Sequence, residues 1–338
     1  MSVAKDLHAC SVREIASATR EAVVVSPCPV CGVREARPRF GVEGCSAPVV
    51  VCSQCGLGRY EPMPGANEVL SYYPEEYYGQ QGTKFQRVIE SLVRVAAARH
   101  IAFLSRGLPA RARVLDVGCG RGVILGPLAE RDFEVHGVEL RVEAALGVDP
   151  RAEVRVAPRL ADAGYAGDHF HEVVLWHVLE HLADPRGALA EAFRVLRPGG
   201  RLVVAVPNFS SLQARWAGAA WFHLDAPRHL FHFPREALLR LLEELGFAVE
   251  SEHHFSLRQN PFGWIQSGLN RSRRLPRNGL YTLLHERSSR APAPYSRGMR
   301  CWLLICGLLA APFALAASVI AAKLRRGATL HVVARKPG

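Results

Sequence analysis

Four cysteines stand in two pairs at a spacing that suits a metal ion. They are Cys28, Cys31, Cys52 and Cys55, and a glycine follows each pair. Glycine accepts the positive φ of a tight turn, which lets backbone amides face the sulfur atoms. Four thiolates held in this way make a closed tetrahedral Zn²⁺ site with no open position for a substrate. The spacing therefore predicts a structural zinc ion, with four buried, metal-free cysteines as the alternative.

A glycine-rich turn follows an apolar run in the middle of the chain. Its members include Gly118, Cys119, Gly120 and Gly122, and Asp116 lies two residues before it. Such a turn lets a ligand approach the backbone and meet the amides that begin the next helix. A dinucleotide site prefers the spacing G-x-G-x-x-G, which seats a pyrophosphate. The G-x-G-x-G spacing and the Asp116 carboxylate favour instead a ligand with a cationic amino group.

An acidic residue, Glu139, ends the next apolar run, 23 residues after Asp116. A carboxylate about 20 residues beyond a glycine turn can accept hydrogen bonds from both hydroxyl groups of a ribose. The two carboxylates and the turn together predict a site for a nucleoside.

Short β-branched runs alternate with helical segments from residue 113 onward. The runs cover 114–116, 135–138, 154–156, 173–176, 202–206 and 247–249. This alternation predicts a mainly parallel, doubly wound α/β sheet. A ligand then binds at the carboxyl ends of the strands, where Asp116 and Glu139 stand.

Over residues 113–257 the chain resembles the class I S-adenosylmethionine (SAM)-dependent methyltransferases. The glycine turn and the two carboxylates carry the resemblance, with further matches at 176–181, 196–200 and Pro207-Asn208. The resemblance implies a Rossmann-like sheet, into which the last strand inserts antiparallel, and SAM as the cofactor. It implies SAM contacts from Asp116, Gly118, Cys119, Gly120, Gly122, Glu139, Trp176 and His177.

Two positions depart from the pattern of this family. The fourth strand begins with Phe170-His171, where many relatives have Phe-Asp, and the usual acidic adenine contact after the third strand has no obvious counterpart. Asp162 is the candidate for that contact.

The loop 225–234 after the fifth strand holds candidates for catalysis. In the family this loop overhangs the acceptor, and methyl transfer requires positioning, plus a base when the acceptor is a hydroxyl or an acidic carbon. His229 is the first candidate for the base because histidine titrates near neutral pH, and His181 is the second. Asp225 or Arg228 would position the acceptor. The alternative for His229 is a purely structural hydrogen bond.

The segment His177-Val-Leu-Glu180-His181 also fits the H-x-x-E-H pattern of a metalloprotease. That pattern requires a long helix, whereas here a strand runs directly into the motif and Asp184-Pro185 follows it. The sequence favours a role in lining the SAM pocket. A divalent metal ion at His177, Glu180 and His181 remains open.

The net charge of +11 is concentrated at one end of the chain. Residues 258–338 contain 14 Lys or Arg and one acid, whereas residues 1–257 carry 28 basic and 30 acidic residues. The basic part encloses 22 uncharged residues, 301–322, and about 20 apolar residues suffice to cross a bilayer. The strand at 328–334 must join the main sheet, which disfavours a single crossing. Pro312 therefore predicts a hairpin or in-plane helix that turns there, with a buried helix pair as the alternative.

The predicted organisation has seven segments, and its N-terminal part looks like methyltransferases with an added zinc-binding domain. The segments are an N-terminal tail (1–22), a zinc-ribbon-like domain (23–65), a Tyr-rich link and helix (66–110), the SAM-binding core (111–257), a basic linker (258–300), the hydrophobic segment (301–322) and the final core strand (323–338).

These features predict a SAM-dependent methyltransferase that acts on a small-molecule, glycan or lipid-linked acceptor. The N-terminus has no apolar leader, and the cysteines lack a disulfide spacing, which indicates a cytoplasmic protein. We expect it at the cytosolic face of the inner or plasma membrane through 301–322, and nucleic acid is a disfavoured partner. The alternatives are an RNA-modifying methyltransferase that grips RNA with the ribbon and basic stretch, and a catalytically silent SAM-binding scaffold.

Overall fold

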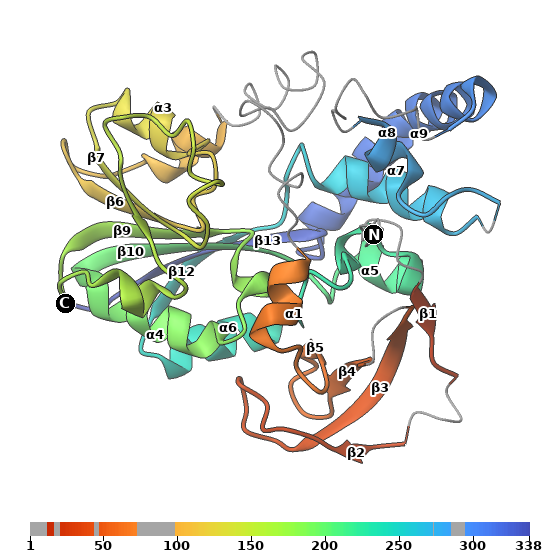
Figure 1. The fold of residues 1–338 in the computed structure, drawn as a ribbon, viewed down its shortest axis with the longest axis horizontal. Helices are drawn as coiled ribbons and strands as arrows, with labels where there is room; N and C mark the ends of the chain where they lie inside the picture. The colour runs from red at the N-terminus through yellow and green to blue at the C-terminus, as the bar shows by residue number, and fades with distance from the viewer. Residues whose placement is uncertain (1–11, 17–20, 44–46, 73–98, 273, 285–294) are drawn as a thin grey trace. The chain divides into compact units, whose positions relative to one another are not determined.

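The structure is a computed structural model with two compact units (Figure 1). It describes residues 12–16, 21–43, 47–72, 99–272, 274–284 and 295–338. Unit 1 comprises Met1–Pro74, Pro207–Ala237 and His254–Leu330, and unit 2 comprises Glu75–Val206, Leu238–His253 and His331–Gly338. Much of the predicted tail (1–22) and of the Tyr-rich link and helix (66–110) lies outside the described residues.

Unit 2 is built on a mixed seven-stranded sheet with the order β12-β13-β10-β9-β6-β7-β8. The strands are β6 (Arg113–Val117), β7 (Glu134–Glu139), β8 (Glu153–Val156), β9 (Phe170–Trp176), β10 (Leu196–Pro207), β12 (Ala248–His253) and β13 (Thr329–Arg335). β6 to β10 pair in parallel, and β13 pairs antiparallel with β12. The predicted α/β sheet with an antiparallel last strand is confirmed.

The central strands of this sheet have consecutive buried residues, as expected when both faces are covered. Leu115, Val174 and Val203 are fully buried representatives of β6, β9 and β10. The helices of this unit include α3 (Leu125–Ala129), α4 (Pro185–Val195) and α6 (Arg235–Glu244), and the first residues of α6 belong to unit 1. Because β6 and β7 are neighbours, Asp116 and Glu139 lie at adjacent strand ends.

Unit 1 contains a second, antiparallel sheet with the order β1-β3-β4-β5-β11, to which β2 adds beside β3. Its strands are β1 (Val12–Glu14), β2 (Val23–Val24), β3 (Glu35–Val42), β4 (Val49–Cys52), β5 (Gly58–Tyr60) and β11 (Phe231–His232). β11 comes from the loop predicted to hold catalytic residues, and it pairs with β5. The sequence did not predict that this loop completes the N-terminal sheet.

The helices of unit 1 are α1 (Ala66–Ser71), α5 (Leu212–Ala217), α7 (Asn260–Asn270), α8 (Gly279–Leu284) and α9 (Arg297–Lys323). The hairpin predicted at Pro312 is wrong, because α9 continues through this residue as one helix. Proline removes its own N–H bond and costs about 3 kcal/mol in a helix interior. Buried residues on both sides of the proline, such as Leu303 and Ser318, offset that cost by packing α9 against its neighbours.

Candidate functional site

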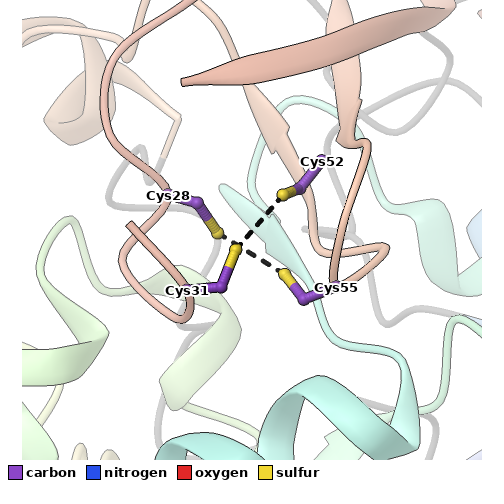
Figure 2. A group of neighbouring side chains, drawn as sticks. All are labelled: Cys28, Cys31, Cys52 and Cys55. Carbon is purple, nitrogen blue, oxygen red and sulfur yellow. Dashed lines mark hydrogen bonds between the residues drawn. The ribbon is translucent and has the colours of Figure 1, made fainter. Parts of the chain in front are cut away.

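The four predicted zinc ligands come together in unit 1. Cys28 and Cys31 lie between β2 and β3, Cys52 is the last residue of β4, and Cys55 lies on the turn between β4 and β5. Figure 2 shows the four side chains converging, with Sγ atoms 3.5 Å apart in the pairs Cys28–Cys55 and Cys31–Cys52. The glycines after each pair, Gly32 and Gly56, have φ of 74° and 72°. The turns therefore have the conformation that the sequence predicted.

The cysteine cluster is compatible with a structural zinc ion. Its four sulfur atoms lie within 4.8 Å of one another, and ligands about 2.3 Å from a central zinc would have a similar spacing. All four thiols are free of disulfides. The hydrogen bond from the Cys55 thiol lowers the pKa of Cys28 below its ordinary value, which favours the thiolate form that binds zinc.

The glycine turn of unit 2 lies where a ligand can reach it. The N–H groups of Gly118 and Cys119 donate to the Val138 carbonyl at 2.7 and 3.2 Å, which fixes the turn against β7. Gly118 has φ of 70°, and a Cβ there would lie 2.6 Å from Val178 Cγ2. Gly120 has φ of 49°, but a Cβ there would meet nothing within 4 Å. Protein packing thus dictates the first glycine, whereas the second faces open space.

Asp116 is a buried carboxylate beside this turn, with 3% of its surface exposed. Burial, and secondarily the charge of Glu139, raises the pKa of Asp116 to about 8. Within the described residues no side chain or backbone N–H donates to this carboxylate. A buried carboxylate without donors is costly unless a ligand supplies them.

Glu139 is also buried, and it connects the turn to the end of β7. Its Oε2 accepts from the Gly120 N–H at 2.9 Å, and its Oε1 accepts from the Leu140 N–H at 2.8 Å. These bonds fix the carboxylate at the strand end, next to the open side of Gly120. The geometry suits recognition of a polar ligand that lies along the turn.

His177 and Glu180 interact directly after β9. His177 has φ of 54°, and its Nδ1 lies 3.3 Å from Oε1 of the buried Glu180. His181 ends a 3₁₀ turn, Leu179–His181. The H-x-x-E-H motif of a metalloprotease requires a long helix that places both histidines on one face. Here the motif ends in a short 3₁₀ turn, which argues against a metalloprotease.

The loop of unit 1 that holds His229 forms a hydrogen-bonded group with Asp225 and Arg228. Arg228 pairs with Asp225, with 3.1 Å between Nε and Oδ2. His229 Nδ1 lies 2.8 Å from the His223 carbonyl oxygen, and Nε2 lies 3.7 Å from Asp225 Oδ2. Because a carbonyl only accepts, Nδ1 donates and Nε2 becomes the basic nitrogen of the neutral ring.

The neighbouring His232 is a poor candidate for a base. Its ring is buried in β11, and this burial, with the charge of Arg39 second, lowers its pKa to about 3. The candidate bases His229 and His181 belong to unit 1 and unit 2 respectively.

A family model described as a methyltransferase domain matches residues 89–252, which include the glycine turn and both carboxylates. The chain contains a class I SAM-dependent methyltransferase domain. The strand order and the antiparallel last strand agree with this assignment, and the predicted family is confirmed.

Relatives of the methyltransferase domain come from several bacteria. An uncharacterized 37.1 kDa protein in transposon TN4556 of Streptomyces fradiae is 32% identical over 178 residues, which are 46% of this chain and 51% of that protein. A ubiquinone biosynthesis O-methyltransferase of Ruegeria pomeroyi is 27% identical over 176 residues, 45% of this chain and 65% of that protein. The chain thus spans half to two thirds of these relatives. A solved SAM-dependent methyltransferase from Archaeoglobus fulgidus has a TM-score of 0.47 and 19% identity, covering 78% of this chain and 97% of that one.

Three further residues that the sequence predicted to contact SAM interact with other parts of the protein. Asp162 forms hydrogen bonds of 2.7 and 2.9 Å with Arg159, which lower the pKa of Asp162. The Trp176 ring centroid lies 4.7 Å from that of His100 and 4.6 Å from that of His331. The Cys119 side chain is buried, and burial raises the pKa of its thiol. Cys119 therefore acts in packing, and only the backbone of this residue borders the turn.

One group of charged residues in unit 1 was missed by the sequence analysis. Arg215, Arg235, Arg325 and Arg326 line a pocket of about 340 Å³. They come from three stretches far apart in the chain, so no local spacing brings them together. The only signal was the basic cluster that follows the uncharged segment 301–322.

Proposed function

We propose that this protein is a SAM-dependent methyltransferase that acts on a small-molecule or lipid-linked acceptor. The observation that carries the proposal is the buried Asp116 carboxylate beside the glycine turn of a class I sheet. It has no donor among the described residues, and the amino group of SAM would supply one. When bound, SAM supplies an electrophilic methyl group on a sulfonium sulfur.

The remaining SAM contacts follow from the positions around Asp116. Glu139 lies at the next strand end and would accept hydrogen bonds from the ribose hydroxyls. Gly120, where a Cβ would meet no protein atom within 4 Å, leaves room for the ligand against the backbone. Asp162 is the weakest of the proposed contacts, because Arg159 already occupies its carboxylate.

The acceptor is proposed from the relatives and from the loop of unit 1. The ubiquinone relatives are named as O-methyltransferases, which supports a hydroxyl acceptor on a small molecule. His229 would remove the proton of such a hydroxyl through Nε2, because its Nδ1 is held by the His223 carbonyl. Asp225 lies 3.7 Å from Nε2 and would stabilise the protonated ring, while Arg228 keeps Asp225 in place.

The zinc ion and the membrane complete the proposal. The four cysteines of the cluster would hold a structural zinc ion, whose closed coordination leaves it no part in methyl transfer. Among the described residues one helix, α9, is long and apolar enough to cross a membrane, and only 22% of its most apolar window is buried. We propose that this helix keeps the protein at the cytosolic membrane face.

Transfer of a labelled methyl group from SAM tests the proposed activity. Purified protein is incubated with labelled SAM and with the lipid, soluble-metabolite and RNA fractions of a bacterial extract, and an Asp116→Ala variant serves as the control. We expect label in the lipid or metabolite fraction with the unaltered protein only. Label in RNA alone would contradict the proposed acceptor class, and normal SAM binding without any transfer would contradict the activity.

A further inference from the structure

Most of the surface of α9 is apolar and exposed within unit 1. Its buried residues are Leu303, Gly307, Ala314, Ser318 and Ala321, and the helix contacts α7 and α8. The exposed residues include Trp302 (56%), Leu308 (76%), Leu309 (68%), Phe313 (77%) and Ile320 (57%). Because buried positions run along nearly the whole helix, α9 stays packed on unit 1. Such a helix can lie in the plane of a membrane surface, but it cannot cross the bilayer alone.

Two pockets of unit 1 each have a residue of α5 in their lining. The first, of about 360 Å³, is apolar, and its lining includes Trp216, Trp264, Phe313 and Ala317. The second, of about 340 Å³, is the arginine pocket, and its lining includes Arg215 and Leu324. Adjacent residues of α5, Arg215 and Trp216, thus serve different pockets. Ala317 of α9 and Leu324, which directly follows this helix, are seven residues apart, which is about 10 Å along a helix.

The arginine pocket has a large excess of positive charge. Four arginines line it, and Glu236 is the one acidic residue in its lining. Glu236 lies 3.7 Å from Arg235. The side chains of Arg215 and Arg326 have no hydrogen bond or ion pair with any described residue. Guanidinium groups gathered in this way repel one another, and a phosphate group, which accepts paired hydrogen bonds from them, relieves that repulsion.

The end of α9 places two of these arginines by an unusual backbone conformation. Arg325 has φ of 55°, a conformation that usually belongs to glycine at the end of a helix. The N–H groups of Arg325 and Arg326 donate to the carbonyls of Ala322 and Ala321 at 2.9 and 2.8 Å, which closes the last turn of the helix. A charged side chain therefore occupies a position where glycine would be more stable. This cost is consistent with a functional role for the arginine.

We propose that unit 1 binds an anionic phospholipid of the membrane surface. The phosphate lies among Arg215, Arg235, Arg325 and Arg326, and the acyl chain lies against Trp216, Trp264 and Phe313. Ala317 and Leu324 line different pockets, and the roughly 10 Å of rise between them fits one amphiphile that has its charged group at one end. The apolar face of α9 then enters the interface beside the bound lipid. The inference rests on the proposed function for the membrane location alone, and not on methyl transfer.

Flotation of the full chain with vesicles tests this proposal. The vesicles are phosphatidylcholine alone, or phosphatidylcholine mixed with phosphatidylglycerol. We expect at least about tenfold tighter binding to the anionic vesicles. Arg325→Gly removes one charge but keeps the backbone conformation of the helix end, so the variant folds. It should lose about fivefold in affinity for anionic vesicles. Arg274→Ala, which removes an exposed charge outside the pocket, should lose less.

A second variant tests the apolar part of the site. Phe313 is 77% exposed, so Phe313→Ser leaves the core intact and should weaken binding to both kinds of vesicle. Equal binding to both vesicles, unchanged by Arg325→Gly, would overturn the phosphate site. Displacement by millimolar inorganic phosphate would show that the pocket takes free phosphate instead of lipid.

Two further outcomes distinguish the lipid site from a dimer interface and from the SAM site. A chain that ignores vesicles, but forms a dimer that Phe313→Ser dissociates, would assign the face of α9 to a second copy and overturn the proposal. Asp116→Asn should lose SAM binding and keep vesicle binding, since Asp116 belongs to the other unit. A failed methyl-transfer assay with intact, Arg325-dependent vesicle binding would thus contradict the proposed function and leave the lipid site standing.

Discussion

The backbone N–H of Gly120 donates a hydrogen bond of 2.9 Å to Oε2 of Glu139. This bond connects the turn after β6 to the end of β7. The carboxylate proposed to bind the ribose therefore also holds the turn that SAM must contact. Binding and shape of the site depend on the same side chain.

Glu139→Ala should remove both functions at once. A hydrogen bond to a charged group contributes about 1.5–3 kcal/mol, so the loss of two ribose bonds lowers SAM affinity by about 100-fold or more. Glu139→Gln keeps one acceptor oxygen and should lose less, about tenfold. Isothermal titration calorimetry with SAM measures both. Equal affinities for the two variants and the unaltered protein would show that Glu139 is not in the site.

Two glycines of the turn should respond differently to alanine. In Gly118→Ala the new Cβ meets Val178 at 2.6 Å on a backbone with φ of 70°, so the melting temperature falls. In Gly120→Ala the Cβ meets no protein atom within 4 Å, and the cost is the strain of φ of 49°, about 1 kcal/mol. This variant should fold and yet bind SAM at least about tenfold more weakly. Thermal melting measures the stability of both variants, and calorimetry measures their affinity for SAM. Normal SAM binding by folded Gly120→Ala would contradict the proposed contact.

The stability of the ligand-free protein should depend on the ionisation of Asp116. Burial raises its pKa from 3.8 to about 8, so the folded state holds a proton that the unfolded chain releases. This contribution favours folding at low pH and is lost as pH rises from about 4 to about 8. Asp116→Asn cannot ionise, so its melting temperature should exceed that of the unaltered protein increasingly toward about pH 8. The control is Asp132→Asn, an exposed aspartate of the same unit. Parallel curves for all three proteins would refute the raised pKa.

The same ionisation should appear in SAM binding. The amino group of SAM binds the charged carboxylate, whereas below about pH 8 most Asp116 is protonated. SAM affinity should therefore rise with pH by up to about tenfold per unit below that value, and binding should release a proton. Calorimetry in buffers of different ionisation enthalpy counts that proton. Its absence would mean that Asp116 does not meet the amino group.

Removal of one cysteine should release the proposed zinc ion. Purified protein should contain one zinc per chain, and Cys52→Ser should contain none because three ligands hold the ion poorly. Unit 1 should then lose at least about 3 kcal/mol of stability. Cys301→Ser, at an exposed cysteine of α9, is the control and should keep the metal. Elemental analysis measures the zinc content, and chemical unfolding measures the stability. Purified protein that contains no zinc and has unaltered stability would show that the cysteine cluster does not hold a structural zinc ion.

Replacement of the proposed base should affect turnover and spare SAM binding. His229→Gln should lower kcat by about 100-fold, the usual contribution of a positioned base, and flatten the acidic side of the pH–rate profile. His253→Gln, at an exposed histidine of unit 2, should change neither. The acceptor fraction that takes up label provides the assay. A full pH–rate profile in His229→Gln would leave His229 with a structural role in its loop.

Local patterns in the sequence were sufficient to predict the strands of the methyltransferase domain. The β-branched runs predicted where its strands lie, because strand formation depends on short-range alternation and burial. Their bounds differ most at β10, which begins six residues before its run, and at β12, which ends four residues after its run. The two Cys-x-x-Cys-Gly units predicted their cluster for the same reason, since each turn positions its own pair of thiols. Asp116 was identified because it ends one such run, and Glu139 because it directly follows the next.

Tertiary structure decided the features that depend on distant segments. β11 pairs with β5 by placing Phe231 opposite Arg59, about half the chain away, and no local pattern encodes that partner. α9 continues through Pro312 because residues on both sides of the proline are buried by packing within unit 1, a stabilisation that helix propensity alone omits. The arginines of α5, α6 and the end of α9 form one pocket only after folding. The sequence by itself thus determined the strands, the metal-ligand turns and the carboxylates, while long-range packing determined which surfaces and charges meet.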